Sequence, residues 1–278
     1  ASSIRSATYF RYCPRCFQED LARYGELYWH RMHQIPGWDV CVKHGTWLIN
    51  SKVALRQTNK HVFAEPTEEV CPLDQVAFIT VSELLSHYRS IGNGIEALLK
   101  QRFPHRPLDW FQSHYEAKLR QKHYASLVSG KVDQAKLQRD FVQYYGNDFL
   151  ERLQSSLRGE SNWLAAMVRK HRRSFHPLRH LLLMNFLGIS LEEMFFQDEQ
   201  YKPFGDGPWI CLNPAAEHFQ QKVITDLTIS ICEITKEVIG TFACTCGFVY
   251  TRRAGERDPS KISRVKQYGK VWEQTCLR

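Results

Sequence analysis

The order of apolar and polar positions predicts a helical middle part of the chain. Between residues 133 and 157, apolar and charged positions alternate at helical spacing. A second pattern, from 164 to 182, is interrupted by Pro177, which favours the first turn of a new helix. We therefore predict one helix at 162–173 and another at 177–187, closed by Gly188. Ser190-Leu-Glu-Glu193 predicts the start of a third helix. Three such helices are typical of a helix-turn-helix, and an ordinary bundle would show the same pattern.

The segments before and after this helical middle part differ from it in composition. The first 75 residues are rich in Trp, Tyr and Pro, with a short helix predicted to end at Gly25 and a turn at Pro36-Gly37. Thr80-Val-Ser-Glu83 resembles a capping box and predicts a helix from about Val81 that ends before Gly92. From Lys202 onward, Pro, Gly and β-branched residues predict short strands at 224–234 and 237–250.

Four residues near the start have the types and spacing of a zinc site. Cys13 and Cys16 form a C-x₂-C pair, and Cys41 and His44 follow after 24 intervening residues. A tetrahedral Zn²⁺ accepts these ligands, and four of them leave no position for water. The pattern predicts a zinc ion that stabilises structure and performs no catalysis.

A second set with similar separation lies in the predicted C-terminal strands. Cys211 and His218 are separated by six residues, and 25 residues separate His218 from Cys244. Cys244-Thr-Cys246-Gly247 is predicted to form a turn, where glycine permits a left-handed backbone. We predict a second closed zinc site from Cys211, His218, Cys244 and Cys246, with Cys232 or Cys276 as possible substitutes for one ligand. A buried pair of strand cysteines with a surface histidine is the alternative.

These patterns together predict a mostly α fold with small zinc-stabilised β elements. We expect an N-terminal zinc-finger module at 1–75, a helical, DNA-binding region at 76–200, and a second zinc-binding β-hairpin module with a basic tail at 201–278. The length of 278 residues with 43% hydrophobic content supports such a core, and no apolar run is long enough to span a membrane. The opening Ala-Ser-Ser without methionine is consistent with a fragment.

The charge balance favours a polyanionic partner. The formal net charge is +8, which fits nucleic acid or simply a basic protein. An acid-free stretch from 169 to 180 favours DNA contact because Arg side chains and helix amino termini suit phosphate oxygens; a solvated helix face is the alternative. The DNA-binding residues that we predict are Arg169, Lys170, Arg172, Arg173, His176, Arg179, Arg252 and Arg253.

The sequence lacks common catalytic motifs, and its cysteines indicate a reducing compartment. The sequence has no H-E-x-x-H, G-x-S-x-G or P-loop motif, and His114-Tyr-Glu116 lacks the P-C-x-x-C of zinc deaminases. Nine cysteines, an odd number in a long chain, favour a reducing cytoplasm over a disulfide framework. We expect no catalytic residue and no small-molecule substrate.

The quoted motifs resemble the TniQ/TnsD family, the target-site selectors of Tn7-like transposons. The resemblance lies in Arg11-Tyr-Cys-Pro-Arg-Cys16, Tyr28-Trp29-His30-Arg31, His33-Gln-Ile-Pro36-Gly37 and Cys41-Val-Lys-His44-Gly45. Trp163-Leu164 with residues 169–175, and Gly240 to Tyr250, are similar to the TnsD branch.

The resemblance implies a bacterial, nucleoid-associated protein that binds a chromosomal attachment site in double-stranded DNA. It also implies recruitment of the AAA+ regulator TnsC, with no chemistry performed by the protein itself. The alternative within the family is a TniQ-like adaptor that bridges an RNA-guided complex to TnsC.

Overall fold

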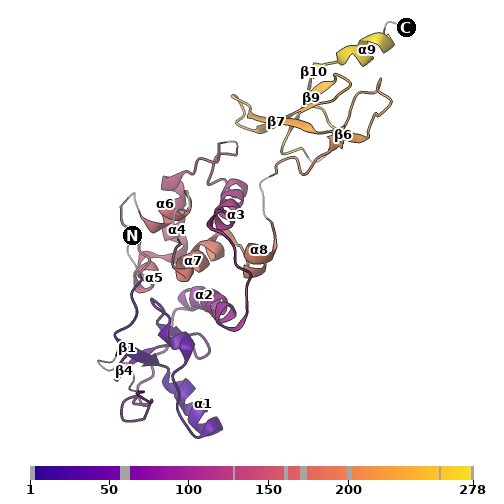
Figure 1. Ribbon diagram of the computed structural model, residues 1–278. Coiled ribbons are helices and arrows are strands. Elements are labelled where there is room, and N and C mark those ends of the chain that lie inside the picture. Colours follow the sequence, from indigo (N-terminus) through magenta and orange to yellow (C-terminus); the bar gives the residue numbers. More distant parts are fainter. Residues whose placement is uncertain are drawn as a thin grey trace. The chain divides into compact units, whose positions relative to one another are not determined.

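The computed structural model describes residues 4–56, 63–127, 129–159, 162–169, 174–198, 202–256 and 258–276. Two compact units form: one from residues 1–116 and 132–199, the other from 117–131 and 200–278. Helices dominate the first unit and strands the second, so the protein is mixed α and β (Figure 1). The predicted zinc-finger and helix-turn-helix modules, and the three-part domain division, stay predictions. No helix in these ranges is long and apolar enough to cross a membrane.

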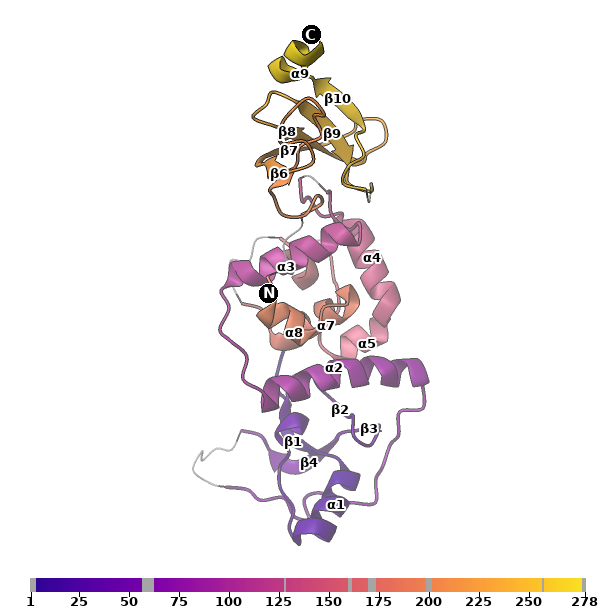
Figure 2. The same cartoon turned by 90° about the vertical axis from the view of Figure 1, so that its right-hand side faces the viewer.

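The N-terminal segment of the first unit folds into small β ladders around one helix (Figure 2). Helix α1 ends, as predicted, at Gly25, whose left-handed backbone (φ 75°) suits glycine. Strand β1 pairs antiparallel with β4, and β2 pairs with β3. The elements are β1 (Tyr9–Tyr12), α1 (Pro14–Tyr24), the 3₁₀ helix η1 (Arg31–Gln34), β2 (Val40–Cys41), β3 (Thr46–Trp47) and β4 (Ile49–Ala54).

Helices build the rest of the first unit. Helix α7 begins with Pro177 and ends at left-handed Gly188, and the hydroxyl of Ser190 caps α8 by accepting the Glu193 N–H, all as predicted. The helices are α2 (Ser82–Lys100), α3 (Leu108–Gln121, shared with the second unit), α4 (Gln134–Tyr145), α5 (Asn147–Arg152), α6 (Trp163–Met167), α7 (Pro177–Leu187) and α8 (Leu191–Phe196).

Two helix predictions were wrong. Helix α2 does not stop before Gly92 but continues to Lys100, and its first cap is Val81, without a side-chain hydrogen bond. The glycines are needed for packing: a Cβ on Gly92 would lie 2.5 Å from Val42 Cγ1, and one on Gly94 would lie 2.7 Å from Leu181 Cδ2. The helix predicted at 162–173 ends earlier, because α6 stops at Met167 with Val168 as its C-cap; residues 170–173 lie outside the described ranges.

The second unit is built on a four-stranded antiparallel sheet in the order β10-β9-β8-β7 (Figure 2). A separate pair is formed by β5 and β6. Strands at the predicted places flank the Cys244–Gly247 turn, which joins β8 to β9. Phe242, Phe248 and Tyr250 form its buried aromatic core. The elements are β5 (Trp209–Ile210), β6 (Lys222–Ile224), β7 (Asp226–Ile231), β8 (Val238–Ala243), β9 (Val249–Arg253), β10 (Arg264–Gln267) and α9 (Gly269–Cys276).

Candidate metal centres and nucleic-acid interface

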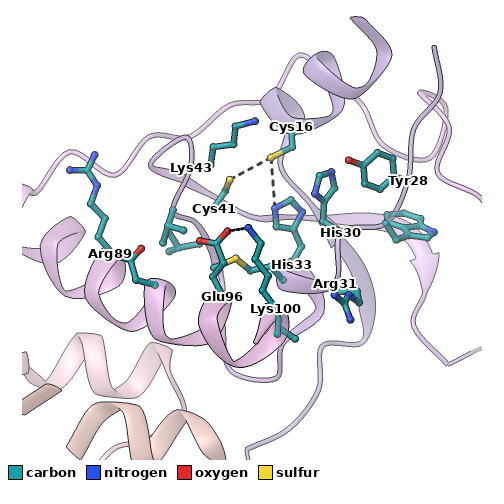
Figure 3. Close-up of a pocket in the computed structure, with 16 residues that line it drawn as sticks. Cys16, Tyr28, His30, Arg31, His33, Cys41, Lys43, Arg89, Glu96 and Lys100 are labelled. Carbon is teal, nitrogen blue, oxygen red and sulfur yellow. Dashed lines mark hydrogen bonds and ion pairs between the residues drawn. The ribbon is translucent and has the colours of Figure 1, made fainter. Parts of the chain in front are cut away.

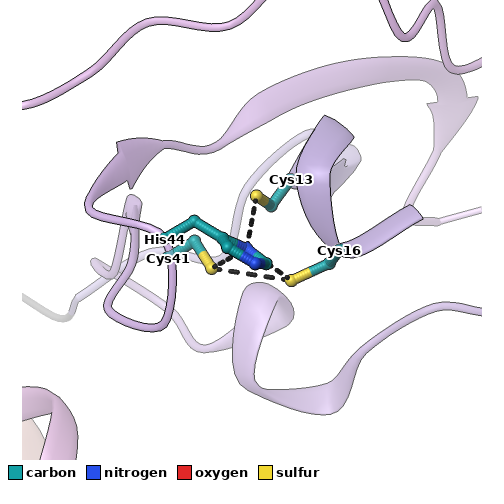
Figure 4. Close-up of side chains that lie close together, drawn as sticks. All are labelled: Cys13, Cys16, Cys41 and His44. Atoms are coloured by element: carbon teal, nitrogen blue, oxygen red, sulfur yellow. Dashed lines mark hydrogen bonds between the residues drawn. The ribbon is translucent and has the colours of Figure 1, made fainter. Parts of the chain in front are cut away.

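The first predicted ligand set converges at one point (Figure 4). Cys13 immediately precedes α1, and Pro14 starts the helix, which places Cys16 in its first turn on the same side. Cys41 ends β2, and His44 lies in the turn to β3, closed by the bond from Gly45 N–H to the Cys41 carbonyl oxygen at 2.8 Å. All three sulfurs are buried.

The distances in this cluster fit tetrahedral zinc. His44 Nδ1 lies 3.5 Å from Cys13 Sγ, 3.4 Å from Cys16 Sγ and 3.6 Å from Cys41 Sγ. The sulfurs of Cys16 and Cys41 are 3.6 Å apart. A zinc ion with standard bond lengths at a tetrahedral angle would place sulfur about 3.8 Å from sulfur and about 3.5 Å from nitrogen. The donor set and its spacing therefore suit Zn²⁺.

The electrostatics of the cluster also call for a cation. Hydrogen bonds from Cys16 and Cys41 lower the pKa of Cys13 below its ordinary value, while sharing a proton with Cys13 raises the pKa of Cys16. Three buried sulfurs this close cannot all become thiolates without a positive charge between them. A metal ion would supply that charge and displace the thiol protons.

An outer carboxylate can orient His44 as a metal ligand. Glu19 Oε1 lies 3.0 Å from His44 Nε2 and can accept its N–H, which leaves Nδ1 free to face the sulfurs. Glu19 also pairs with Lys43. Spacing alone did not identify Glu19, although it lies three residues after Cys16 on the same helix.

A third group, which the sequence analysis did not predict, shares Cys16 with the first cluster. His30 and His33 can join Cys16 around one ion. His33 Nε2 lies 3.9 Å from Cys16 Sγ, and buried Asp20 accepts a hydrogen bond from His30 Nε2 at 2.7 Å. With zinc bound to Cys16 in the first cluster, these imidazoles surround the metal site as outer groups.

The second predicted set also converges, in the second unit. Cys211 Sγ and Cys246 Sγ are 3.8 Å apart, and His218 Nε2 lies 3.3 Å from Cys244 Sγ. Burial raises the pKa of Cys211 to about 12. Burial also acts to raise the pKa of Cys246, but hydrogen bonds, including one donated by Asn213 Nδ2 at 3.5 Å, outweigh it and lower that pKa to about 7. This donor set likewise suits zinc, and Cys232 is not part of it.

The basic residues predicted to contact DNA fall into different environments. Arg169 and Arg253 are exposed, the latter paired with Glu237 at 3.1 Å. Lys170, Arg172 and Arg173 lie outside the described residues. His176, half-buried, caps α7 by accepting the Leu178 N–H on Nδ1.

Two of the predicted contacts are buried. The guanidinium of Arg179, a residue only 4% exposed, lies over the Trp163 ring, 5.3 Å from its centroid. Arg252 is 7% exposed, lies over Phe242 and donates to the Asp258 carbonyl oxygen at 3.3 Å. Neither guanidinium faces solvent in this conformation, so a DNA interface would depend on the exposed members of the set.

Another arginine has a structural role that the sequence analysis did not identify. Arg11 is buried, and its guanidinium donates to the carbonyl oxygens of Ile35, at 2.7 Å, and Trp38. The side-chain amide of Gln34 accepts a hydrogen bond from the backbone N–H of Arg11 and donates one to the backbone carbonyl oxygen of Arg11. These bonds fix the loop that leads from η1 to the candidate ligand Cys41.

Comparison with known proteins agrees with the predicted resemblance. Residues 91–277 match the family described as Tn7-like transposition protein D (TnsD), and residues 1–48 match the TniQ family. The chain is also 28% identical, over 192 residues, to the transposon Tn7 transposition protein TnsD of Escherichia coli. That alignment covers 67% of this chain and 36% of the relative, so the chain spans little more than a third of the relative's length.

Proposed function

The chain belongs to the family of Tn7-like transposition protein D, and on this premise we propose that it selects the target site for a Tn7-like transposon. In this proposal it binds an attachment site in duplex DNA and recruits the AAA+ regulator TnsC. The observation that carries the proposal is the family match over residues 91–277, which is more than half of the chain. A match to TniQ covers only residues 1–48, so the adaptor alternative is not favoured.

The proposed role involves no catalysis. Each of the two main clusters offers four protein ligands, Cys13, Cys16, Cys41 and His44 in one and Cys211, His218, Cys244 and Cys246 in the other. Zinc bound by four protein ligands cross-links the chain and has no open position for a substrate. The residues of these clusters would hold the local backbone in place, and DNA contact would come from other side chains.

Phosphate contacts would give most of the affinity. The segment 169–173 carries Arg169, Lys170, Arg172 and Arg173 close together in sequence, and Arg169 is exposed. Cations at phosphates release counterions, so binding should weaken steeply as salt rises. Contacts of this kind set the position of the protein on DNA without reading its sequence.

The test is titration of the zinc-loaded chain with a fluorescent random-sequence duplex over a series of salt concentrations. Replacing Arg172 and Arg173 together with alanine should reduce the slope of log K against log salt by about two, because each lost phosphate contact removes about 0.9. A matched control is Arg139→Ala/Arg158→Ala, since these exposed arginines lie beside Asp140 and Glu151. An unchanged slope in the first variant would remove the segment from the interface, and no binding at low salt would refute the DNA-binding role.

Recruitment needs a separate assay. Purified TnsC should co-sediment with duplex-bound chain and not with duplex alone. If TnsC does not co-sediment with the chain on any DNA sequence tried, the proposed recruitment of TnsC is refuted, while the proposed DNA binding is not.

A further inference from the structure

The longest helix of the described chain carries a polar stripe with an unusual mixture of side chains. Arg89, Asn93, Glu96 and Lys100 follow one another at steps of four, three and four along α2, which places them on one helical face. Figure 3 labels Arg89, Glu96 and Lys100 on this helix. Arg89, Asn93 and Lys100 are exposed, while Tyr88, Ile91 and Ile95 on other faces are buried.

This stripe forms one wall of a groove of about 880 Å³. The other side of the groove is the zinc-cluster segment, which contributes Tyr28, Arg31 and Lys43, while Cys16 and Cys41 also line it (Figure 3). The groove thus lies within one unit, between α2 and the first candidate zinc site.

The groove has unbalanced positive charge. Its carboxylate, Glu96, binds Lys100 Nζ at 2.5 Å, and Lys43 pairs with Glu19. Neither Arg31 nor Arg89 has an ion pair within the part of the chain that the structure describes. Both are exposed, so two guanidinium groups are available for an anionic partner.

We propose that the exposed face of α2 enters the major groove of duplex DNA, with Arg89 and Asn93 at base edges and Arg31 at a phosphate. This inference rests on the proposed DNA-binding function. The major groove, about 12 Å wide, admits a helix, and Arg and Asn form paired hydrogen bonds with guanine and adenine. Arg31, from η1 on the opposite wall, is placed to hold the backbone.

The chemistry of the stripe favours DNA over an acidic protein segment. A carboxylate-rich partner would be held by cations alone, and the exposed amide of Asn93 would add little to such a contact. Base edges present donors and acceptors together, which an amide matches with both of its polar atoms. Arg89 and Asn93, which lie one helical turn apart, are therefore suited to contact adjacent bases.

The helix is also held rigidly enough for such a role. At Gly92 and Gly94, α2 packs so closely against Val42 and Leu181 that neither position has room for a Cβ. Val42 lies between the ligands Cys41 and His44, so the metal site and the stripe are fixed to each other. Recognition of bases requires side chains whose supporting backbone does not move.

The experiment is selection of bound sequences from a randomised duplex library, using the zinc-loaded wild type and single variants. Asn93→Ala and Arg89→Ala should each abolish the preference at one position and weaken binding to the selected duplex about ten-fold, as loss of one bidentate base contact predicts. Arg31→Ala should keep the preferred sequence, weaken all duplexes alike and lower the salt slope by about one. Arg139→Ala on α4, which does not line the groove, is the matched control.

The outcomes separate this inference from the function on which it rests. If the wild type selects a sequence and both α2 variants select the same one with equal affinity, the assignment of α2 is overturned and DNA binding stands. If the variants bind DNA normally but no longer retain TnsC, the groove is a protein-docking surface and the assignment is equally overturned. If the wild type binds no duplex, both proposals fail. Zinc content and far-ultraviolet circular dichroism of each variant establish that it is folded.

Discussion

Removal of zinc from the first cluster should unfold the surrounding N-terminal segment. The hydrophobic cluster beside the candidate zinc site is small: Tyr12 and Phe17 are fully buried and pack with Cys71. Burial of two such aromatic side chains stabilises by about 2–3 kcal/mol each. A structural zinc site contributes about 10–16 kcal/mol near pH 7, which exceeds this and rivals the stability of a whole domain at about 5–15 kcal/mol.

The loss should be visible through tryptophan. Trp38 is fully buried, packs edge-on against Tyr88 at 5.4 Å, and lies three residues before the ligand Cys41. Trp38 is one of seven tryptophans. Treatment with a zinc chelator, or the substitution Cys13→Ser, should therefore remove its contribution to the near-ultraviolet circular dichroism of the protein and shift the total tryptophan fluorescence to the red. Cys232→Ser is the matched control, because this half-buried cysteine lies in the other unit and outside the metal clusters.

The reasoning would be refuted by a metal-free protein that keeps its near-ultraviolet spectrum and its affinity for duplex DNA. Measured zinc content must accompany the spectra, so that retained structure is not due to retained metal. A Cys13→Ser protein that still binds two zinc ions per chain would contradict the assignment of that ligand.

Three further results are expected. Cys211→Ser should lower the zinc content, measured by plasma emission spectrometry, by one ion per chain. The contribution of Trp38 to the near-ultraviolet spectrum should persist, because the cluster that contains Cys211 lies in the other unit. Loss of both ions would contradict this prediction. Gly92→Ala should lower the free energy of unfolding by about 1–3 kcal/mol despite alanine's higher helix propensity, since the added Cβ would lie 2.5 Å from Val42 Cγ1; urea titration measures it, and the added substitution Val42→Ala should restore part of the loss. Arg179→Ala should destabilise by about 2 kcal/mol through lost packing on Trp163, whereas exposed Arg169→Ala should keep the melting temperature and weaken DNA binding; equal melting temperatures for the two variants would refute the distinction.

The metal clusters were predictable because their signal is local. The pairs Cys13–Cys16 and Cys244–Cys246 each place two possible ligands within a few residues, so C-x₂-C and C-x-C show in the sequence without knowledge of the fold. The outer groups are harder to find. Asp20 and His33 lie near the first cluster because of the positions of α1 and η1 in the fold. Nothing in their sequence spacing distinguishes them from ordinary polar residues.

The helix error has a physical cause of another kind. A glycine ends a helix when its backbone turns left-handed, as at Gly25 and Gly188. At Gly92 the residue instead makes room for Val42, and at Gly94 for Leu181, a contact with a residue far along the chain. The sequence shows the same letter in both cases, and only the tertiary contact distinguishes them.

The net charge of the sequence likewise does not show which basic side chains are exposed, and exposure decides which of them can contact DNA. The net charge of +8 counts every arginine, yet Arg11, Arg179 and Arg252 are buried against carbonyl oxygens or aromatic rings. These cations stabilise the fold and are poorly placed to neutralise phosphates, so the number of basic residues overstates the DNA-binding surface. In the proposed DNA-binding role, affinity would come from fewer, exposed groups, and each would carry a larger share of the salt dependence than an even distribution over all basic residues would give it. Arg31 and Arg89 are such groups, which is why single substitutions in the α2 groove should have measurable effects on DNA binding.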